Sequence, residues 1–286
     1  MIGSRVCAAK GISLVVVVVL ALSAWPGFGW AGSLRFQGEM VQGGLIRGIA
    51  VPGAVVTLNG ALVRVAEDGR FVFGLGHDAE PWALVKARFP DGSRHRLVLK
   101  IRQRDYPEQH VDGLAPAQVT PPESVRARIR ADAAKVAAAR ATDTDRGEAL
   151  DDFVWPAVGP ITGVFGSRRV LNGTPRARHF GVDVAAGEGT EVVAVAGGIV
   201  RLADDLYFSG NTVVIDHGHG LSSSYLHLSQ MSVAEGDEVA QGAPIGRIGA
   251  TGRATGPHLD WRVNWFGARL DPALVAGAMP EPPATD

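Results

Sequence analysis

Three short segments of the chain place histidine and carboxylate side chains at spacings that suit metal binding or acid–base chemistry. His179 and Asp183 are separated by three residues, and His258 and Asp260 by one. Residues two apart on a β-strand project from the same face, so His258 and Asp260 are expected to point together. Imidazole nitrogens and carboxylate oxygens bind first-row metal ions, and both groups also transfer protons. Taken alone, His258 and Asp260 are equally compatible with a strand that has an exposed polar face, and a pair such as His179 and Asp183 is more often structural.

A third histidine, His227, follows Tyr225 by two positions in a β-rich run. The same alternation predicts that these two side chains share one face of a strand. Gly181 lies between His179 and Asp183, where it allows the backbone to bend or another group to approach closely. His227 by itself would be interpreted as a packed or surface residue.

The elements that must position these residues are short strands. From 153 to 275 the sequence consists of brief β-rich runs with many glycines, and no long helical period appears. We therefore expect a C-terminal all-β domain, an antiparallel sheet, over residues 153–275. Its expected strands cover 191–195, 198–202, 211–216, 222–228 and 258–264.

The preceding region, 32–118, carries the turn signals of a second, smaller β domain. Asn59-Gly60 separates two β-rich runs, and Asp68-Gly69 and Asp91-Gly92 repeat the signal. These dipeptides supply the positive φ angles that tight hairpins require. The region is predicted to be a small β-sandwich. Two of its histidines have no partner at ligand spacing and are interpreted as surface residues: His77 and His95.

Residues 119–152 are predicted to form a helix and a linker. Thr120, Pro121 and Glu123 resemble an N-cap, a proline at the first helical position and a capping-box glutamate. A narrow apolar stripe surrounded by basic residues follows. It favours a solvated connecting helix over a basic arm that contacts anionic cell wall. The polar segment 142–152 is expected to be a linker, and the proline-containing tail 276–286 to be disordered.

The composition names no partner, but the N-terminus indicates export. The formal net charge is −1, with 20% charged residues, so no basic field suggests nucleic acid. Residues 1–31 have the pattern of a secretory signal peptide cleaved after Ala31, with an uncleaved anchor as the alternative. The only cysteine, Cys7, lies in this segment, so the mature chain would form no disulfide. We expect a periplasmic rather than extracellular protein, with no stable membrane insertion after cleavage.

Together, the segments of the C-terminal region resemble the lysostaphin/LytM-type zinc metallopeptidases, a family of peptidoglycan endopeptidases. The resemblance rests on the order and spacing of 179–183, 210–218, 225–229, 236–249 and 251–259. It implies a Zn²⁺ ion in a groove of a β-sheet domain. The family's HxxxD motif implies that His179 and Asp183 are ligands. The family's remaining histidines, at His227 and His258 here, flank the active water, with base and stabiliser unassigned.

The sequence departs from this family at one decisive position. Asp260 stands where the HxH motif has its second histidine, which is the third metal ligand. Carboxylate oxygen also binds zinc, so Asp260 is expected to be a substitute ligand. A second carboxylate makes the centre less positive, which weakens activation of water and loosens the preference for zinc over other divalent ions. The alternative is a site that has lost its metal.

The resemblance implies an exported metallo-endopeptidase that hydrolyses peptide cross-links of bacterial peptidoglycan, with stem peptides as its substrate. One alternative is a catalytically inactive factor that binds the wall and regulates another hydrolase, such as an amidase. A second is a structural module that binds the wall. The N-terminal β domain either positions the enzyme or blocks its groove, and the sequence does not distinguish these roles.

Overall fold

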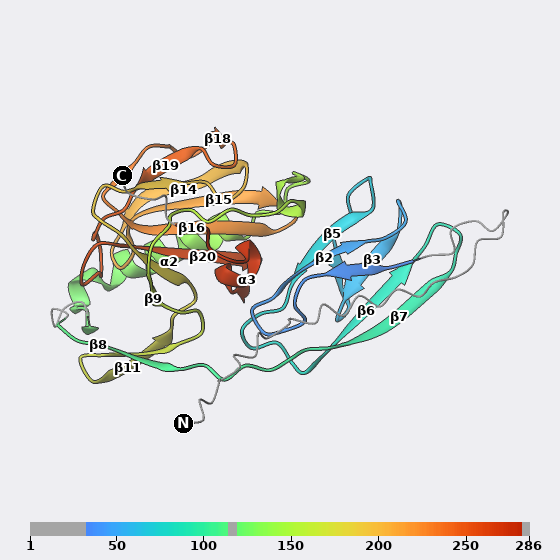
Figure 1. The fold of residues 1–286 in the computed structure, drawn as a ribbon, viewed down its shortest axis with the longest axis horizontal. Coiled ribbons are helices and arrows are strands. Elements are labelled where there is room, and N and C mark those ends of the chain that lie inside the picture. Colours follow the sequence, from blue (N-terminus) through green and yellow to red (C-terminus); the bar gives the residue numbers. More distant parts are fainter. Residues whose placement is uncertain (1–32, 114–118, 282–286) are drawn as a thin grey trace, which may run out of the picture. The chain divides into compact units, whose positions relative to one another are not determined.

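A computed structural model describes residues 33–113 and 119–281 (Figure 1). The predicted signal peptide, 1–31, lies outside these residues, as do 282–286 of the predicted tail. Strands dominate the described part of the chain, which confirms the predicted mainly β fold class. No helix among these residues is long and apolar enough to cross a lipid bilayer.

Two sheets form the N-terminal β region. They share one apolar core, in which Phe71, Phe73 and Val85 are fully buried, and this is the packing of a small sandwich. The predicted hairpin is present, because Asn59 and Gly60 join its strands with φ of 50° and 93°. One sheet has the order β1 (Arg35–Gln37), β2 (Leu45–Ile49), β5 (Arg70–Gly74), and the other β4 (Ala61–Val63), β3 (Val55–Leu58), β6 (Trp82–Arg88), β7 (Arg94–Lys100).

An eight-stranded antiparallel sheet forms the centre of the C-terminal region (Figure 1). One of its faces carries Tyr225 and Trp261, which are buried in a core with Val192 and Ile245 of a small second sheet. The order of the large sheet is β18 (Glu238–Val239), β14 (Gly198–Leu206), β15 (Gly210–Gly218), β16 (Leu221–Leu228), β20 (His258–Trp265), β12 (Val182–Ala185), β9 (Ile161–Gly163), with β21 (Ala268–Leu270) paired to β20. The small sheet consists of β13 (Glu191–Val193), β19 (Pro244–Arg247) and β17 (Gln230–Met231).

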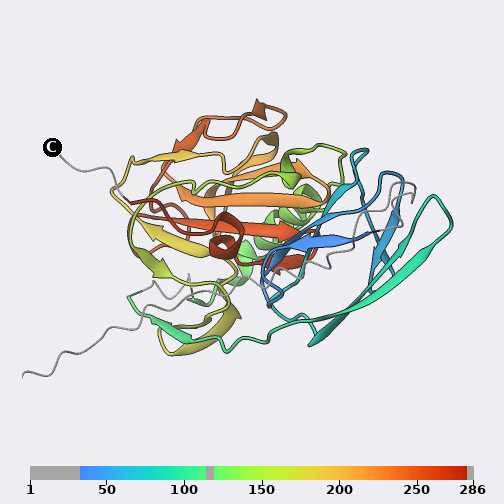
Figure 2. The same cartoon turned by 45° about the vertical axis from the view of Figure 1, so that its right-hand side comes forward.

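The helix α2 (Arg126–Arg140) packs on the opposite face of this sheet (Figure 2). Its Ala139 and Val136 form a second apolar cluster with Val214 of β15. Residues alternate in a strand, so Val214 faces α2 while its neighbours face the main core. Lys135 of α2 also reaches Asp204 of β14, at 2.6 Å. Only Ala139 of this helix is buried, so the helix is largely solvated, as predicted, but its narrow apolar stripe also docks it on the sheet.

The start of this helix also differs from the prediction. It begins at Arg126 after a 3₁₀ turn, Glu123–Val125, and no side chain caps either element. Pro122 has extended backbone angles, with φ −65° and ψ 158°, so Pro122 itself is not part of a helix. A proline disfavours helical geometry in the residue that precedes it, which excludes Pro121 as the first helical position.

Three connecting segments pack more closely than the sequence predicted. In the expected linker, a short helix η2 (Glu148–Leu150) buries Leu150 in the main core. The helix α3 (Pro272–Ala276) ends where the expected tail begins, and in that tail the carbonyl of Gly277 accepts a hydrogen bond from Trp155 Nε1. The strand β8 (Glu108–Val111) belongs to the expected N-terminal domain, yet it pairs in parallel with β10 (Arg168–Leu171), which in turn pairs with β11 (Thr174–Arg178).

Candidate active site

Strand pairing brings the two candidate carboxylates together. β12 and β20 run antiparallel, and their register places Asp183 directly opposite Asp260. Both residues are buried, at 5% and 0% exposure. Like charges directly opposite each other on a sheet are destabilising, and buried carboxylates need compensation. This pair of strands therefore requires nearby positive charge.

His179 completes the cluster from the loop between β11 and β12. Its backbone is fixed, because its N–H donates to the Ser167 carbonyl and its own carbonyl accepts from Gly166 N–H. The ring lies between the two carboxylates. Nε2 is 3.0 Å from Asp183 Oδ1, and Nδ1 is 3.8 Å from Asp260 Oδ2. One ligand atom of each residue lies within 4.8 Å of the others, so the structure brings the three predicted ligands together.

The chain leaves room for this cluster by placing glycine beside it. A Cβ atom on Gly181 would lie 2.3 Å from Asp260 Oδ1, and one on Gly163 would lie 2.2 Å from Asp183 Oδ2. Any side chain at either position would displace a carboxylate. Gly181 thus permits the close approach that its place in the sequence suggested.

The donor atoms in this cluster fit a metal ion. Both ring nitrogens of His179 and the Oδ1 atom of Asp183 are buried without a well-directed hydrogen bond, although His179 Nε2 and Asp183 Oδ1 lie within ion-pair distance. Buried polar atoms are nearly always paired, so the convergence of these atoms is compatible with a bound cation. Imidazole nitrogen with carboxylate oxygens is a donor set that zinc and other first-row ions accept.

Two further histidines lie beside the cluster with their rings in contact. The ring centroids of His227 and His258 are 4.8 Å apart. Nδ1 of His227 is 2.8 Å from the Thr251 carbonyl, and Nδ1 of His258 is 2.9 Å from the Gly256 carbonyl. A carbonyl only accepts, so each Nδ1 carries the hydrogen and each Nε2 is left as an acceptor. Burial lowers the pKa of His227 to about 4, so this ring is neutral at neutral pH.

Comparison with known proteins identifies the region that contains these residues. Residues 177–272 match the family described as Peptidase family M23. The chain carries an M23 peptidase domain. Over 103 residues it is 43% identical to the DD-carboxypeptidase/endopeptidase Mpg of Neisseria meningitidis, a match that covers 36% of this chain and 24% of that protein. Over 127 residues it is 36% identical to the murein hydrolase activator EnvC of Escherichia coli, covering 44% of this chain and 28% of that protein.

A solved structure matches the chain more completely. A Pseudomonas aeruginosa protein described as a peptidase M23 is 29% identical, with a TM-score of 0.65, and the match covers 85% of this chain and 96% of that one. The curated relatives, by contrast, share only about a quarter of their own length with this chain. The shared fold therefore includes most of the described residues, while the shared sequence is concentrated in the M23 domain.

Each carboxylate of the M23 domain's cluster is also paired with an arginine. Arg262 Nε donates to Asp260 Oδ1 at 2.9 Å and its Nη2 donates to Oδ2 at 2.5 Å, while Arg169 donates to Asp183 Oδ2. Burial would raise the pKa of Asp260, but Arg262 and His179 hold that pKa well below its usual range. For Asp183, burial also opposes ionisation, yet His179 and Arg169 lower its pKa. Both carboxylates are therefore charged at neutral pH.

These arginine partners were missed from the sequence, although one of them left a signal. Arg262 follows Asp260 by two positions on β20, so the strand alternation that paired His258 with Asp260 also includes Arg262. Arg169 lies on a different strand, β10, and no local spacing connects it to Asp183. A carboxylate oxygen has more than one lone pair, so Asp260 can bind an ion while it accepts from Arg262.

One prediction about the strand geometry was wrong. Tyr225 and His227 do not share a face, because β16 contains a bulge between its pairs Asn211↔Leu228 and Val213↔Tyr225. His227 has a φ of 65°, which turns it away from the regular alternation. Tyr225 consequently points into the core, while His227 joins its neighbour Leu226 on the face that carries Asp260. A bulge re-aims side chains in this way, and here it delivers the histidine to the site.

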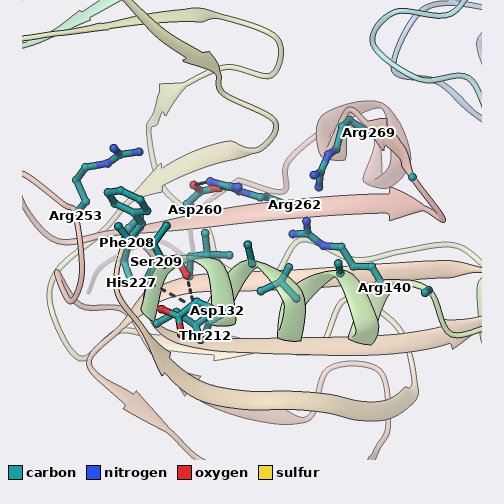
Figure 3. A pocket seen from close by; sticks show the side chains of 18 of the residues that line it. Asp132, Arg140, Phe208, Ser209, Thr212, His227, Arg253, Asp260, Arg262 and Arg269 are labelled. Carbon is teal, nitrogen blue, oxygen red and sulfur yellow. Dashed lines mark hydrogen bonds and ion pairs between the residues drawn. The ribbon is translucent and has the colours of Figure 1, made fainter. Parts of the chain in front are cut away.

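A cavity of about 680 Å³ lies between α2 and this face of the sheet, shown in Figure 3. His227 and Asp260 line it together with Phe208 and Arg253, and the cavity continues along α2 to Arg140 and Arg269. The helix α2, which was predicted only to connect two domains, therefore forms one wall of the groove beside the candidate metal cluster.

The remaining histidines divide between surface and structure. His95 is exposed, as predicted. His77 is not a simple surface residue, since its ring centroid is 4.4 Å from that of Phe180, the residue after His179. His217 is fully buried, with Nδ1 2.6 Å from the Gly197 carbonyl and Nε2 2.8 Å from Ser223 Oγ. None of these three belongs to the cluster of potential metal ligands found among the described residues.

Proposed function

We propose that this protein is a zinc-dependent endopeptidase that hydrolyses peptide cross-links of bacterial peptidoglycan. The observation that carries the proposal is the convergence of His179, Asp183 and Asp260 with buried donor atoms that have no hydrogen-bond partner. The M23 domain supports a peptidase, and the relative from Neisseria meningitidis is named as a carboxypeptidase and endopeptidase. The protein is proposed to act after export, in the periplasm.

In this proposal His179, Asp183 and Asp260 hold the ion. A bound Zn²⁺ would polarise a carbonyl and lower the pKa of a coordinated water. The roles of Arg262 and Arg169 are then to fix the orientation of the two carboxylates, as hydrogen-bonded partners of metal ligands commonly do. Two carboxylates would formally neutralise a divalent ion, and the adjacent guanidinium groups restore positive charge to the site.

The two histidines of the site handle the proton. Each presents Nε2 as an acceptor, because each Nδ1 donates to a backbone carbonyl. The one nearer the attacking water takes its proton and becomes a donor at Nε2. That proton is then available for the amine that leaves when the peptide bond breaks. The second ring, 4.8 Å away centre to centre, helps to orient the water and to exclude bulk solvent.

The test is metal content combined with digestion of purified peptidoglycan. We expect about one zinc ion per wild-type chain and the release of new amino groups that a chelator prevents. Asp260→Ala should lose both metal and cleavage, whereas His227→Ala should keep the metal and lose cleavage. His95→Ala, at an exposed histidine on β7, serves as the matched control and should retain both. A wild-type chain that binds zinc but releases no amines would contradict the proposal.

A second candidate function is a non-catalytic activator of another wall hydrolase, such as an amidase. The specific observation in its favour is that Arg262 and Arg169 already compensate Asp260 and Asp183 without an ion. The matched relative from Escherichia coli is named as a murein hydrolase activator. This candidate predicts a wild-type chain that takes up no tight zinc and stimulates a purified wall amidase. Failure to stimulate any such enzyme would count against it.

A further inference from the structure

Arginines are the most numerous charged residues in the cavity beside the candidate active site. Among the described residues that line it, arginines outnumber aspartates by five to two. One aspartate, Asp132, accepts a hydrogen bond from Tyr207 N–H, and the other, Asp260, is engaged by Arg262. The five arginines are Arg140, Arg169, Arg253, Arg262 and Arg269. Positive charge therefore exceeds negative charge in this cavity.

Two of these arginines have buried donors that nothing in the described chain satisfies. Arg140, the last residue of α2, donates from Nη2 to Ser224 Oγ at 3.2 Å, but its Nε is buried without a partner. Arg269, on β21, has a buried Nη1 atom without a partner, and its guanidinium carbon is 5.7 Å from the centre of the Phe180 ring. An aromatic ring stabilises a cation but supplies no acceptor for its hydrogens. Unpaired buried donors of this kind indicate a missing acceptor.

These guanidinium groups also lie close enough to repel one another. Burial lowers the pKa of Arg140, and the positive charges of Arg269 and Arg262 add to this effect against that of Asp260, so that the pKa lies at about 9. Burial and Arg262 likewise lower the pKa of Arg269. An anion that enters this end of the cavity would relieve the repulsion and satisfy the free donors. Water would satisfy the donors but not the charge.

We propose that Arg140 and Arg269, with Arg262 beside them, form a subsite that binds a carboxylate of the peptide substrate. A guanidinium group offers a planar pair of N–H donors that matches a carboxylate. The subsite rests on the proposed function in that its ligand is a peptide lying in the same groove as the reacting carbonyl. It adds to that function the requirement for an anionic substrate.

The spacing of the subsite from Asp260 suits a short peptide. Arg269 pairs with Asn264, which lies four residues beyond Asp260 on β20. Four residues of an antiparallel strand span about 13 Å. An arginine side chain reaches back over part of that distance, so the carboxylate would lie within about three residues of the bond to be cleaved. A free carboxylate at the end or on a side chain of a stem peptide meets this requirement.

The test measures binding rather than hydrolysis, so it is independent of catalysis. The chelated, metal-free chain is titrated calorimetrically with acetyl-lysyl-D-alanyl-D-alanine, with the same peptide amidated at its C-terminus, and with inorganic phosphate. We expect the free acid to bind about tenfold more tightly than the amide, as a charge-assisted contact predicts. In Arg269→Gln this preference should fall to less than about twofold, with binding of the amide unchanged. Arg269→Lys, which keeps the charge but not the paired donors, should be intermediate.

Two controls make the result decisive. Arg96→Gln, at an exposed arginine on β7, should retain the full preference for the free acid. Thermal unfolding of each variant identifies any general loss of folding. Equal binding of acid and amide by the wild type, or no detectable binding of the acid, overturns the subsite. So does phosphate binding that depends on Arg269 while peptide binding does not, because the cluster would then recognise phosphate instead. Failure of catalysis with the acid preference intact would leave the subsite standing and reject only the proposed enzyme.

Discussion

Replacing Arg262 with leucine removes the guanidinium group that contacts both carboxylate oxygens of Asp260. Leucine keeps part of the apolar stem of the side chain, so the main change is the loss of charge and of two hydrogen bonds. Asp260 is fully buried and lies opposite a second carboxylate, that of Asp183. Its burial prevents water from replacing the lost partner.

The magnitude follows from the burial of the pair. Breaking a buried ion pair by removing one partner costs about 3–5 kcal/mol, because the other charge is left uncompensated. The Arg262 side chain is 26% exposed and that of Asp260 only 1%, so the lower end of this range applies. A loss of about 3 kcal/mol corresponds to a decrease in Tm of roughly 6–12 °C for a protein of this size.

The assay is urea and thermal unfolding of the metal-free protein in the presence of a chelator. The double variant Arg262→Leu with Asp260→Asn should recover much of the loss, because it removes the buried charge as well. Arg64→Leu is the matched control. Its pair with Asp143 is exposed at 38% and 40%, so this variant should cost less than about 1 kcal/mol. Excess zinc should stabilise Arg262→Leu more than the wild type, since the ion would supply the missing positive charge. If Arg262→Leu proves as stable as Arg64→Leu, Arg262 does not compensate the buried charge of Asp260.

Three further predictions concern other buried groups. The unfolded chain protonates His217 near pH 6.5, but burial lowers its pKa to about 4 in the fold, so about 3 kcal/mol of stability present above pH 6.5 should be lost as pH falls to 4. Urea unfolding at both pH values should show this loss, and His217→Gln should show a smaller one. An equal loss of unfolding free energy in the wild type and in His217→Gln would refute the prediction. Gly181→Ala should lose zinc in elemental analysis, because its Cβ would lie 2.3 Å from Asp260 Oδ1, whereas Gly147→Ala, with open space around it, should not. Tyr225→Phe should cost about 1–3 kcal/mol in urea unfolding by leaving buried Val195 N–H without its acceptor at 2.9 Å, and a cost below about 0.5 kcal/mol would contradict this reasoning.

The sequence predicted those features that depend on local periodicity and local turn chemistry. Asn59-Gly60 predicted its hairpin because only a few residue types adopt positive φ readily. The alternation along 258–264 predicted a strand on which His258 and Asp260 differ in direction from the buried Leu259. The resemblance of several ordered segments to one peptidase family predicted the M23 domain, and the family match confirmed it.

Tertiary structure decided the features that depend on partners distant in the sequence. The bulge in β16 arises from its pairing with β15, and it moved His227 to the face opposite Tyr225. The helix α2 docked on the sheet because residues of β14 and β15 offered apolar contacts, which no property of the helix alone could reveal. Arg169 reached Asp183 from β10, a strand of a different sheet.

The candidate site combines both kinds of information. The resemblance of the segments that contain His179, Asp183 and Asp260 to one peptidase family implied a metal cluster, and these side chains carry suitable donor atoms. Their convergence depended on the register of β12 with β20, and their charge compensation depended on Arg169 and Arg262. Periodicity is a local property of the chain, whereas register, docking and charge pairing are set by contacts between segments that only the fold brings together.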